Sequence, residues 1–402
     1  MQTVLEQLYA QHNKLVKSTS VKFVRSLMGE INWNARLIGI KGPRGVGKTT
    51  LLLQYIKLKS GKQAHALLYV SMDSILLANC TLMDLVDSFE KYGGKILFVD
   101  EVHRYPNWSE ELKNIYDAYP DLKIVFTGSS LLDILNARAD LSRRAVVYEL
   151  QGLSFREYLA LQTGEEPVRI SLTDALNHHH EVVPEIIQSI KPLAHFGNYL
   201  AHGYFPFYYE QPDLYYMKLR EVVNMILEIE LPLLRGVDIS YVHRIKQLLY
   251  ILSQSVPFVP NVSGLSAKMG MQRITLLSYL HYLDEVKLTR NLFKETKGIS
   301  KLQKPLKIYP DNTNLMYALS GEGINTGSLR ETFFANQLSY SHRLQYPGKG
   351  DFLVDERYTF EIGGKGKDFM QLEGIQEAYI AADNIEYGFK NKIPLWLFGF
   401  LY

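Results

Sequence analysis

Residues 42–50 read Gly42-Pro43-Arg44-Gly45-Val46-Gly47-Lys48-Thr49-Thr50, a glycine-rich stretch between two segments of different pattern. The preceding residues 36–41 are mostly apolar and predict a strand, and residues 51–57 have the spacing of a helix. A strand, a loop of the form G-x-x-x-x-G-K-T and a helix together make the Walker A motif, which cradles phosphate groups. The sequence therefore predicts that the whole loop, 42–50, binds a nucleoside triphosphate.

Each part of this loop has a chemical task. The glycines allow backbone N–H groups to turn inward toward phosphate oxygens, and the following helix adds its positive end. Lys48 supplies a positive charge for the β and γ phosphates, and the Thr49 hydroxyl completes the ligand shell of Mg²⁺. The alternative is a glycine-rich turn between a strand and a helix that holds no ligand.

A second motif follows at residues 95–103, Lys-Ile-Leu-Phe-Val-Asp-Glu-Val-His. Four apolar residues before an Asp-Glu pair indicate a buried parallel strand with two carboxylates at its C-terminal end, where open α/β sheets bind their ligands. Asp100 is predicted to hold Mg²⁺, directly or through water, and Glu101 to polarise the attacking water. A glutamate directly after the aspartate favours hydrolysis over nucleotide sensing alone.

Polar residues at two further strands are candidates for contact with the γ-phosphate. The strand pattern at 123–130 ends in small hydroxyl residues, of which Ser129 is favoured over Thr127, and an ordinary Gly-Ser turn is the alternative. Immediately before the next strand, Arg144, and less so Arg143, could stabilise transition-state charge from the same chain or from a neighbouring one. Surface arginines that merely flank a strand are the alternative.

The order of these elements predicts the fold class. Strands alternate with helices over residues 36–150, and one more short strand pattern lies at 67–71. This alternation predicts an α/β domain with a parallel P-loop sheet and flanking helices, and we place it at residues 1–150.

The motifs GPRGVGKTTLL, ILFVDEVHRYPNW, IVFTGSS and LSRRAVVYELQGLSFREYL together resemble prokaryotic AAA-superfamily ATPases of the archaeal-type class, which carry a C-terminal domain of unknown function. YLAHGYFPFYYE and FEIGGKGKDFMQ extend the resemblance over nearly the whole chain. It implies ATP and Mg²⁺ as cofactors and a hydrolytic pair at Asp100 and Glu101. The family usually has Gly-Arg where this chain has Arg143-Arg144, so Arg144 aligns with the family arginine and Arg143 departs from it.

Three modules are predicted after the ATPase core. Residues 151–235 show helical patterns and no convincing strand, which indicates a helical lid. Residues 236–325 contain two short helical segments around Gly270 and then two strand patterns, the order of a winged helix. Residues 326–402 combine a helix with strand patterns and predict a small α+β domain.

The predicted winged helix has features of a DNA-binding surface. Gln272, Arg273 and Thr275 begin its second helix, where base edges would be reached. Its wing, residues 287–307, holds seven Lys or Arg residues against one acid, a density that would grip phosphates and make binding salt-dependent. The lysines expected to contact DNA there are Lys297, Lys301 and Lys304. Contact with a protein, through a loop rich in solvated lysines, is the alternative.

The last module resembles restriction-endonuclease-like nucleases, in which two carboxylates hold Mg²⁺ and a lysine two positions after the second orients water. The residues that would take these roles are Glu331, Asp351, Glu361 and Lys365. Position 363 is a glycine, however, and on an extended strand Lys365 lies about 7 Å beyond the expected place. We therefore expect a retained fold that has lost catalysis.

Composition limits the partners. The 402 residues carry a formal net charge of +2, so contact with DNA has to depend on local patches. The chain has a single cysteine, Cys80, and no N-terminal segment with the layout of a signal peptide. It also lacks an apolar run of the ~20 residues that span a bilayer, so we expect a cytoplasmic protein without a membrane partner.

These features predict a Mg²⁺-dependent ATP-binding and ATP-hydrolysing protein that couples its nucleotide state to a DNA- or protein-binding module. ATP is preferred over GTP because of the resemblance and because the chain has no Asn-Lys-x-Asp motif. A nucleotide-gated scaffold with negligible turnover and an ATP-licensed nuclease are the alternatives. A homo-oligomer is expected if Arg144 acts in trans, and the sequence does not identify a protein partner.

Overall fold

The computed structural model describes residues 2–59, 65–128, 141, 143–294, 303–320 and 323–402. They form two compact units, Met1–Gly152 and Leu153–Tyr402. The predicted division of the second unit into three modules stays a prediction. No helix in the described ranges is long and apolar enough to cross a membrane.

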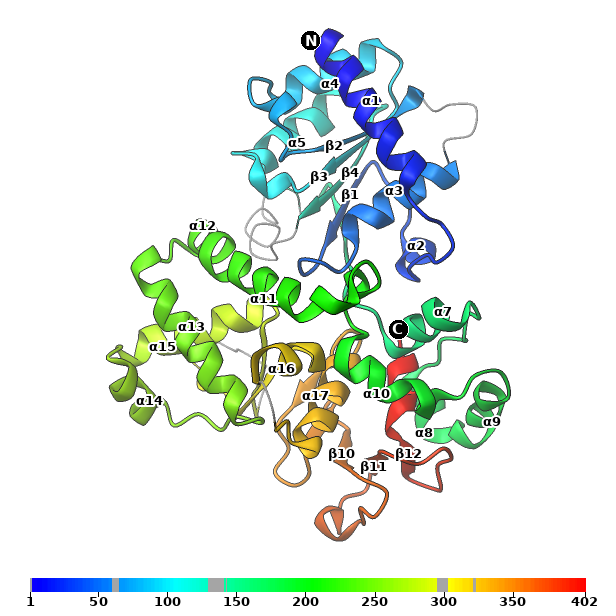
Figure 1. The fold of residues 1–402 in the computed structure, drawn as a ribbon, viewed down its shortest axis with the longest axis vertical. Coiled ribbons are helices and arrows are strands. Elements are labelled where there is room, and N and C mark those ends of the chain that lie inside the picture. Colours follow the sequence, from blue (N-terminus) through cyan, green and yellow to red (C-terminus); the bar gives the residue numbers. More distant parts are fainter. Residues whose placement is uncertain (1, 60–64, 129–140, 142, 295–302, 321–322) are drawn as a thin grey trace. The chain divides into compact units, whose positions relative to one another are not determined.

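The first unit is built on a five-stranded parallel sheet (Figure 1). Its strands are β1 (Leu37–Lys41), β2 (Leu67–Ser71), β3 (Ile96–Asp100), β4 (Lys123–Gly128) and β5 (Val146–Glu149), in the spatial order β2-β3-β4-β1-β5. The central strands β1, β3 and β4 are buried along almost their whole length, as expected for a parallel sheet covered on both faces. The α/β class predicted from the sequence is confirmed.

In the described part of the first unit, two helices precede the first strand and three connect strands, and together they complete the core. They are α1 (Gln2–Ser18), α2 (Leu27–Glu30), α3 (Lys48–Lys59), α4 (Leu82–Lys91) and α5 (Trp108–Ala118). Helix α1 packs against α3, α4 and β2, and its Leu5 and Leu8 join the apolar core. Helix α4 begins where it does because Thr81 and Asp84 form a reciprocal capping box at its N-terminus.

The second unit starts with a helical region. Its helices are α7 (Phe155–Thr163), α8 (Leu172–Asn177), α9 (His179–Ser189), α10 (Pro192–His202), α11 (Tyr215–Met225) and α12 (Leu231–Arg235). Ser154 caps α7 through a reciprocal box with Glu157. Residues 153–235, all of which the structure describes, contain no strand.

Three more helices lead to a pair of strands. They are α13 (Ile239–Gln254), α14 (Val262–Met269) and α15 (Arg273–Glu285), followed by the antiparallel strands β6 (Thr289–Leu292) and β7 (Lys307–Pro310). Helix α14 ends at Gly270, whose φ of +59° is a conformation that glycine adopts without a Cβ clash. The two helices around Gly270 and the two strands predicted after them are thus present in order.

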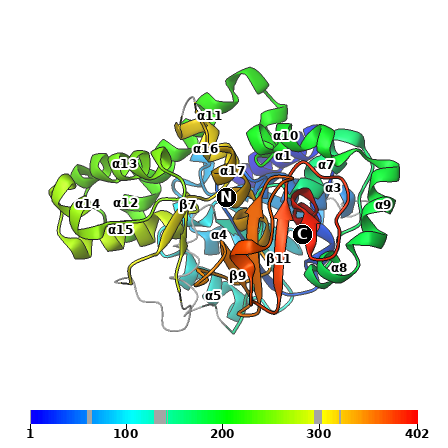
Figure 2. The same ribbon diagram turned by 90° about the horizontal axis from the view of Figure 1, so that it is seen from below.

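A mixed five-stranded sheet ends the chain (Figure 2). After helices α16 (Thr313–Ser320) and α17 (Thr326–Leu338) come β8 (Leu344–Gln345), β9 (Phe352–Val354), β10 (Tyr358–Gly363), β11 (Ala378–Ala382) and β12 (Lys392–Pro394). Strands β8, β9 and β10 pair antiparallel, whereas β10, β11 and β12 pair parallel. Helix α17 packs against β10 and against the 3-10 helix Leu395–Phe400.

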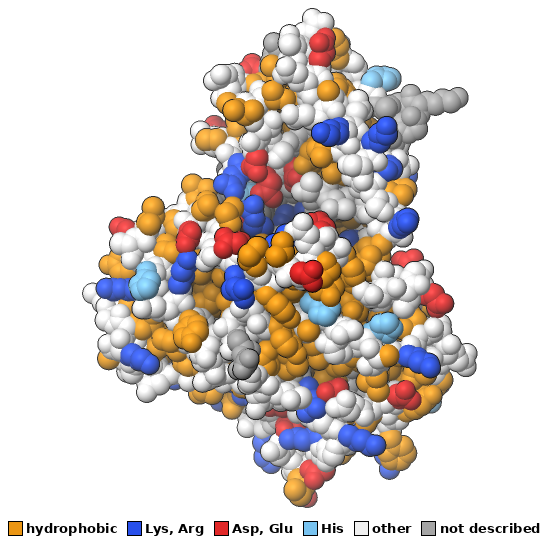
Figure 3. Space-filling view, in the orientation of Figure 1, with side chains coloured by type: hydrophobic (Ala, Val, Ile, Leu, Met, Phe, Trp, Pro, Cys, Tyr) orange, Lys and Arg blue, Asp and Glu red, His pale blue; other side chains and the backbone are white. Residues whose placement is uncertain are grey.

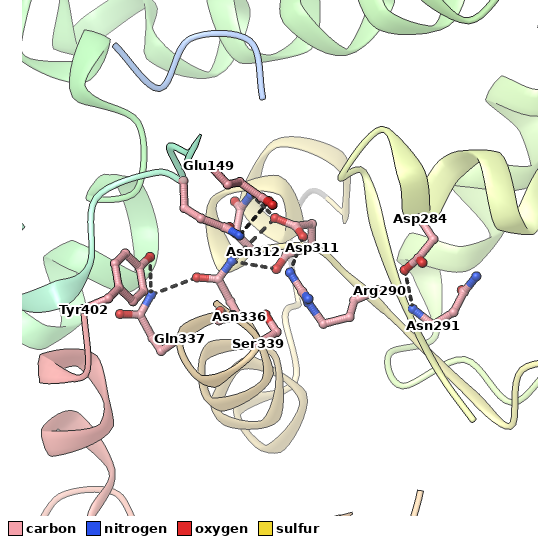
Figure 4. A network of polar contacts seen from close by, with 11 residues as sticks. Glu149, Asp284, Arg290, Asn291, Asp311, Asn312, Asn336, Gln337, Ser339 and Tyr402 are labelled. Atoms are coloured by element: carbon pink, nitrogen blue, oxygen red, sulfur yellow. Dashed lines mark hydrogen bonds and ion pairs between the residues drawn. The ribbon is translucent and has the colours of Figure 1, made fainter. Parts of the chain in front are cut away.

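A polar network is buried in the second unit, where β6, the end of β7 and α17 meet (Figure 4). The Arg290 guanidinium donates to Asp311 Oδ1 at 2.6 Å, and the two side chains are 12% and 1% exposed. The Asn336 amide donates to the main-chain carbonyl of Asp311 at 3.0 Å, and the Gln337 amide donates to Asn336 Oδ1 at 2.8 Å. Because buried charges are tolerated only when they are paired and hydrogen-bonded, this network holds the three elements in one arrangement.

Candidate nucleotide site

The glycine-rich loop lies between β1 and α3, at the carboxyl edge of the parallel sheet. Gly45 and Gly47 have φ angles of +85° and +97°, which glycine adopts without a steric cost. Gly42 is needed for a different reason, because a Cβ on it would lie 2.0 Å from the carbonyl oxygen of Leu150. Helix α3 begins at Lys48, directly after the loop, so its N-terminal N–H groups and dipole add to the cradle.

Lys48 is buried and lies across the loop. Its ammonium donates to the carbonyl oxygens of Gly42 and Pro43, both at 2.9 Å. These two partners are neutral, and a phosphate oxygen would form a stronger, charge-assisted hydrogen bond with the same ammonium. The side chain is therefore already placed at the loop that it is predicted to serve.

Hydroxyl groups from three elements converge on the carboxylate of Asp100 at the end of β3. Thr49 donates to Oδ2 at 2.6 Å, Tyr69 donates to Oδ2 at 2.8 Å, and Thr127 donates to Oδ1. A carboxylate beside the Thr49 hydroxyl is an all-oxygen donor set of the kind that Mg²⁺ prefers, so these residues fit the predicted metal. Sequence reasoning missed Tyr69, whose only signal is a lone hydroxyl-bearing residue in an otherwise apolar part of β2.

Glu101 has a strained backbone. Its φ of +56° lies in the left-handed region, which a glutamate rarely adopts and which is a feature of functional sites. Its main-chain N–H donates to the Thr127 hydroxyl at 3.2 Å, and its Oε2 lies 3.4 Å from Nε2 of His103. Burial, together with the positive charges of Arg104, Lys48 and Arg44, lowers the pKa of His103 to about 3. The imidazole beside Glu101 is therefore neutral at pH 7.

Thr127 occupies the position next to the Asp-Glu pair. It is fully buried, and its hydroxyl both donates to Asp100 and accepts from the Glu101 N–H. It therefore orients the two carboxylate residues in this structure. Ser129, the favoured candidate for contact with the γ-phosphate, lies outside the described residues.

Arg144 forms a two-pronged pair with Asp117 at the end of α5. Its Nε donates to Oδ1 at 3.1 Å and its Nη2 donates to Oδ2 at 2.9 Å. The hydrogen bond with Arg144 lowers the pKa of the Asp117 carboxyl. Arg143 is exposed. For Arg144 to contact a phosphate, as predicted, its pair with Asp117 has to open.

The residues predicted for DNA contact and the other basic residues of the predicted wing divide into three groups. Gln272 and Arg273 are exposed at the start of α15, Thr275 is half-buried, and Lys304 is exposed before β7. Two other basic residues of the predicted wing are paired with acids, Arg290 with Asp311 and Lys307 with Glu331 and Asp351. Lys297 and Lys301 lie outside the described residues.

The carboxylates of the predicted vestigial nuclease site lie near one another and are paired with lysines. Lys307 Nζ is 3.8 Å from Glu331 Oε2 and 3.5 Å from Asp351 Oδ1, and Lys367 Nζ is 2.5 Å from Glu361 Oε1. Burial raises the pKa of both glutamates, and the charge of Asp351 adds to this effect. In the described ranges, no group of three His, Cys, Asp or Glu side chains is placed to hold a metal ion.

Lys365, predicted as the lysine of this site, is exposed. Its main-chain carbonyl accepts a hydrogen bond from Lys392 Nζ at 2.7 Å. The lysine that reaches Glu361 is Lys367, two residues further along the loop that follows β10. The turn after β10, and not the extended strand that the sequence suggests, brings it there.

Comparison with known proteins identifies one part of the chain. Residues 34–159 match a family model described as an AAA domain. No curated protein matches the sequence. Among solved structures, C. elegans PCH-2 is similar, with 18% identity, 71% of this chain and 67% of that chain covered, and a TM-score of 0.25. AMPPCP-bound DnaA from Aquifex aeolicus is also similar, with 14% identity and a TM-score of 0.28. The match covers 64% of this chain and 84% of that chain. Because residues 34–159 match this family model and contain the glycine-rich loop, they are an AAA domain, which is a P-loop ATPase domain.

Proposed function

We propose that this protein hydrolyses Mg²⁺-bound ATP and uses its nucleotide state to control a winged-helix binding module in its second unit. The observation that carries the proposal is the contact between Thr49 and Asp100, 2.6 Å apart at the mouth of the glycine-rich loop. The loop residue and the strand residue predicted to share Mg²⁺ are adjacent in space although 51 positions separate them in the sequence.

The chain's own residues supply a route for hydrolysis by in-line attack of water on the γ-phosphate. Backbone N–H groups of the loop and the Lys48 ammonium hold phosphate oxygens, and Glu101 accepts the proton of the attacking water. Mg²⁺, when bound, balances phosphate charge beside Thr49 and Asp100. Arg144 can add a positive charge in the transition state after it leaves Asp117, from the same chain or from a second copy.

Removal of the metal tests this proposal. The purified protein should release phosphate steadily from ATP in the presence of Mg²⁺ and stop when EDTA is added, because the metal proposed at Thr49 and Asp100 would balance the charge of the transferred phosphate. Phosphate release is measured with a coupled colorimetric assay, and ATP affinity by calorimetry. Binding without release would favour the scaffold with negligible turnover, and an absence of binding would contradict the whole proposal.

The binding module is the part of the second unit from α13 to β7. Gln272 and Arg273 are exposed at the N-terminal end of α15, the end that would reach base edges if α15 is a recognition helix, and this supports contact with DNA. Ile274, which is 61% exposed beside them, favours a protein partner as the second candidate. Figure 3 shows basic side chains lying singly among apolar ones on the part of this face formed by α12 to α15.

Salt dependence separates the two candidates. If the module binds DNA, affinity should fall steeply as salt rises, and the Lys297/Lys301/Lys304→Ala variant should reduce the slope of log K against log salt by up to about 3. Fluorescence anisotropy of a labelled duplex measures both quantities. Lys390→Ala, a loss of one exposed lysine between β11 and β12, is the control and should leave the slope unchanged. Undetectable or salt-insensitive binding would reject DNA in favour of a protein.

The nuclease alternative has less support. Lysines contact the three acidic residues that would have to bind metal, Glu331, Asp351 and Glu361. Because a bound ammonium and a divalent cation compete for the same oxygens, we propose that the C-terminal domain does not cleave DNA.

A further inference from the structure

Arg25 is a buried arginine that connects two distant parts of the first unit. It precedes α2, and its residue is 7% exposed. Nη1 donates to the carbonyl oxygen of Val46 at 2.8 Å, and Nη2 donates to the carbonyl oxygens of Gln151 and Gly152 at 2.8 Å and 2.9 Å. Val46 belongs to the glycine-rich loop, whereas Gln151 and Gly152 follow β5. One guanidinium thus holds backbone from segments more than 100 residues apart in the sequence.

The contact with Val46 fixes the orientation of a peptide group in the loop. In a trans peptide the C=O and the following N–H point in opposite directions. With the Val46 carbonyl held by Arg25, the N–H of Gly47 has to point away from Arg25. This is one of the N–H groups that the motif assigns to phosphate, so Arg25 pre-organises part of the phosphate cradle.

The contact with Gln151 and Gly152 lies where the chain leaves the first unit. Gly152 is the last residue of that unit. This exit segment is also tied to the start of the loop, because the Leu150 N–H donates to the Lys41 carbonyl at 2.8 Å and Gly42 packs directly on the Leu150 carbonyl. A displacement of the loop can therefore be transmitted to residues 151–152 through a short series of direct contacts.

We propose that Arg25 is a positioning residue that couples the phosphate loop to the exit segment Gln151–Gly152. Nucleotide binding at Val46–Gly47 is then transmitted through one side chain to the backbone that enters the second unit. The inference rests on the proposed function, since it assigns the residue through which the nucleotide state is passed on. Coupling is reciprocal, so the same residue raises the affinity of the loop for nucleotide.

Hydrogen exchange with and without ADP tests the coupling directly. In the full-length wild type, ADP should slow exchange at residues 146–152. In Arg25→Met, which keeps the apolar stem and removes the guanidinium donors, this difference should be lost at residues 151–152, and ADP affinity should fall roughly tenfold. Arg25→Lys keeps the positive charge, but a single ammonium cannot reach both segments as the guanidinium does, so this variant should show the same loss. It replaces Arg25→Met in the experiment if Arg25→Met does not fold.

Gln54 offers a matched control. Its buried side-chain amide donates to the Ser20 and Phe23 carbonyls at 2.8 Å and 2.7 Å, so Gln54→Met loosens the segment before Arg25 without cutting the link. An equal loss of coupling in Gln54→Met would mean that Arg25 is merely structural and would overturn the proposal, as would a wild-type response in Arg25→Met. If the wild type binds ADP but releases no phosphate from ATP, the proposed hydrolysis fails, and the exchange comparison still decides the role of Arg25.

Discussion

Replacing Glu101 by glutamine should lower the steady rate of ATP hydrolysis by a factor of about 10² or more, because a positioned general base contributes roughly 10²–10⁴ to a rate. The amide has the size of the carboxylate but cannot accept the proton of the attacking water. The residues proposed to hold phosphate and metal, Lys48, Thr49 and Asp100, are untouched. Affinity for ATP measured by calorimetry should therefore stay within a few-fold of the wild type, and only phosphate release should be lost.

The left-handed backbone at Glu101 makes the choice of glutamine important. A shorter or more flexible residue would change the strain at φ +56° as well as the chemistry, whereas glutamine changes the chemistry alone. Glu110→Gln, an equal change at an exposed acid in the first turn of α5, is the control and should retain wild-type turnover. A Glu101→Gln variant that hydrolyses ATP at more than a third of the wild-type rate would show that another group serves as the base.

The sequence was sufficient to predict the parallel sheet of the first unit because each strand carries its own local signal. The strands are short apolar runs, and β1, β3 and β4 end in, or are directly followed by, glycine, acid or hydroxyl residues that mark the carboxyl edge. Helix α1 has no such signal, and the sequence does not predict it. Only Leu5, Leu8 and His12 of its residues are buried, so its apolar stripe is too narrow to stand out.

The candidate site was predictable where its residues belong to a recognisable motif and not where they lie outside one. Lys48, Thr49 and Asp100 follow from the spacing of two motifs. Tyr69 and Arg25 reach their partners only through the fold, over 31 residues to Asp100 and 126 residues to Gln151. No periodicity or motif in a single sequence encodes such a contact.

The predicted vestigial nuclease site illustrates a second limit. The sequence identifies the acids Glu331, Asp351 and Glu361, but the lysine that pairs with Glu361 depends on how the chain turns after β10. An extended continuation of β10 favours Lys365, while the actual turn brings Lys367 to the carboxylate. Lys307 reaches Glu331 and Asp351 from β7, and only the tertiary structure places it there instead of in the exposed wing that the sequence predicts.

Arg290→Met should destabilise the second unit by about 3–5 kcal/mol, the usual cost of removing one partner of a buried ion pair. Asp311 is 1% exposed, so without the guanidinium its charge would keep only amide donors such as that of Asn312, 3.4 Å away. The loss is measured as the free energy of unfolding in urea. The readout is hydrogen exchange of peptides from β7 and α17. Elements of the first unit serve as the internal reference and should keep their protection.

Two further variants show whether the unpaired charge, and not the lost packing of a long side chain, causes this loss. Adding Asp311→Asn to Arg290→Met removes the uncompensated carboxylate and should recover most of the stability, because a neutral amide can share the hydrogen bonds of Asn312 and Asn336. Arg357→Met breaks an exposed pair with Glu377 at 2.9 Å and should have a far smaller effect, since solvent screens those charges. If the double variant is as unstable as Arg290→Met, the arginine acts mainly through packing of its stem, and the ion pair is not what holds β6, β7 and α17 together.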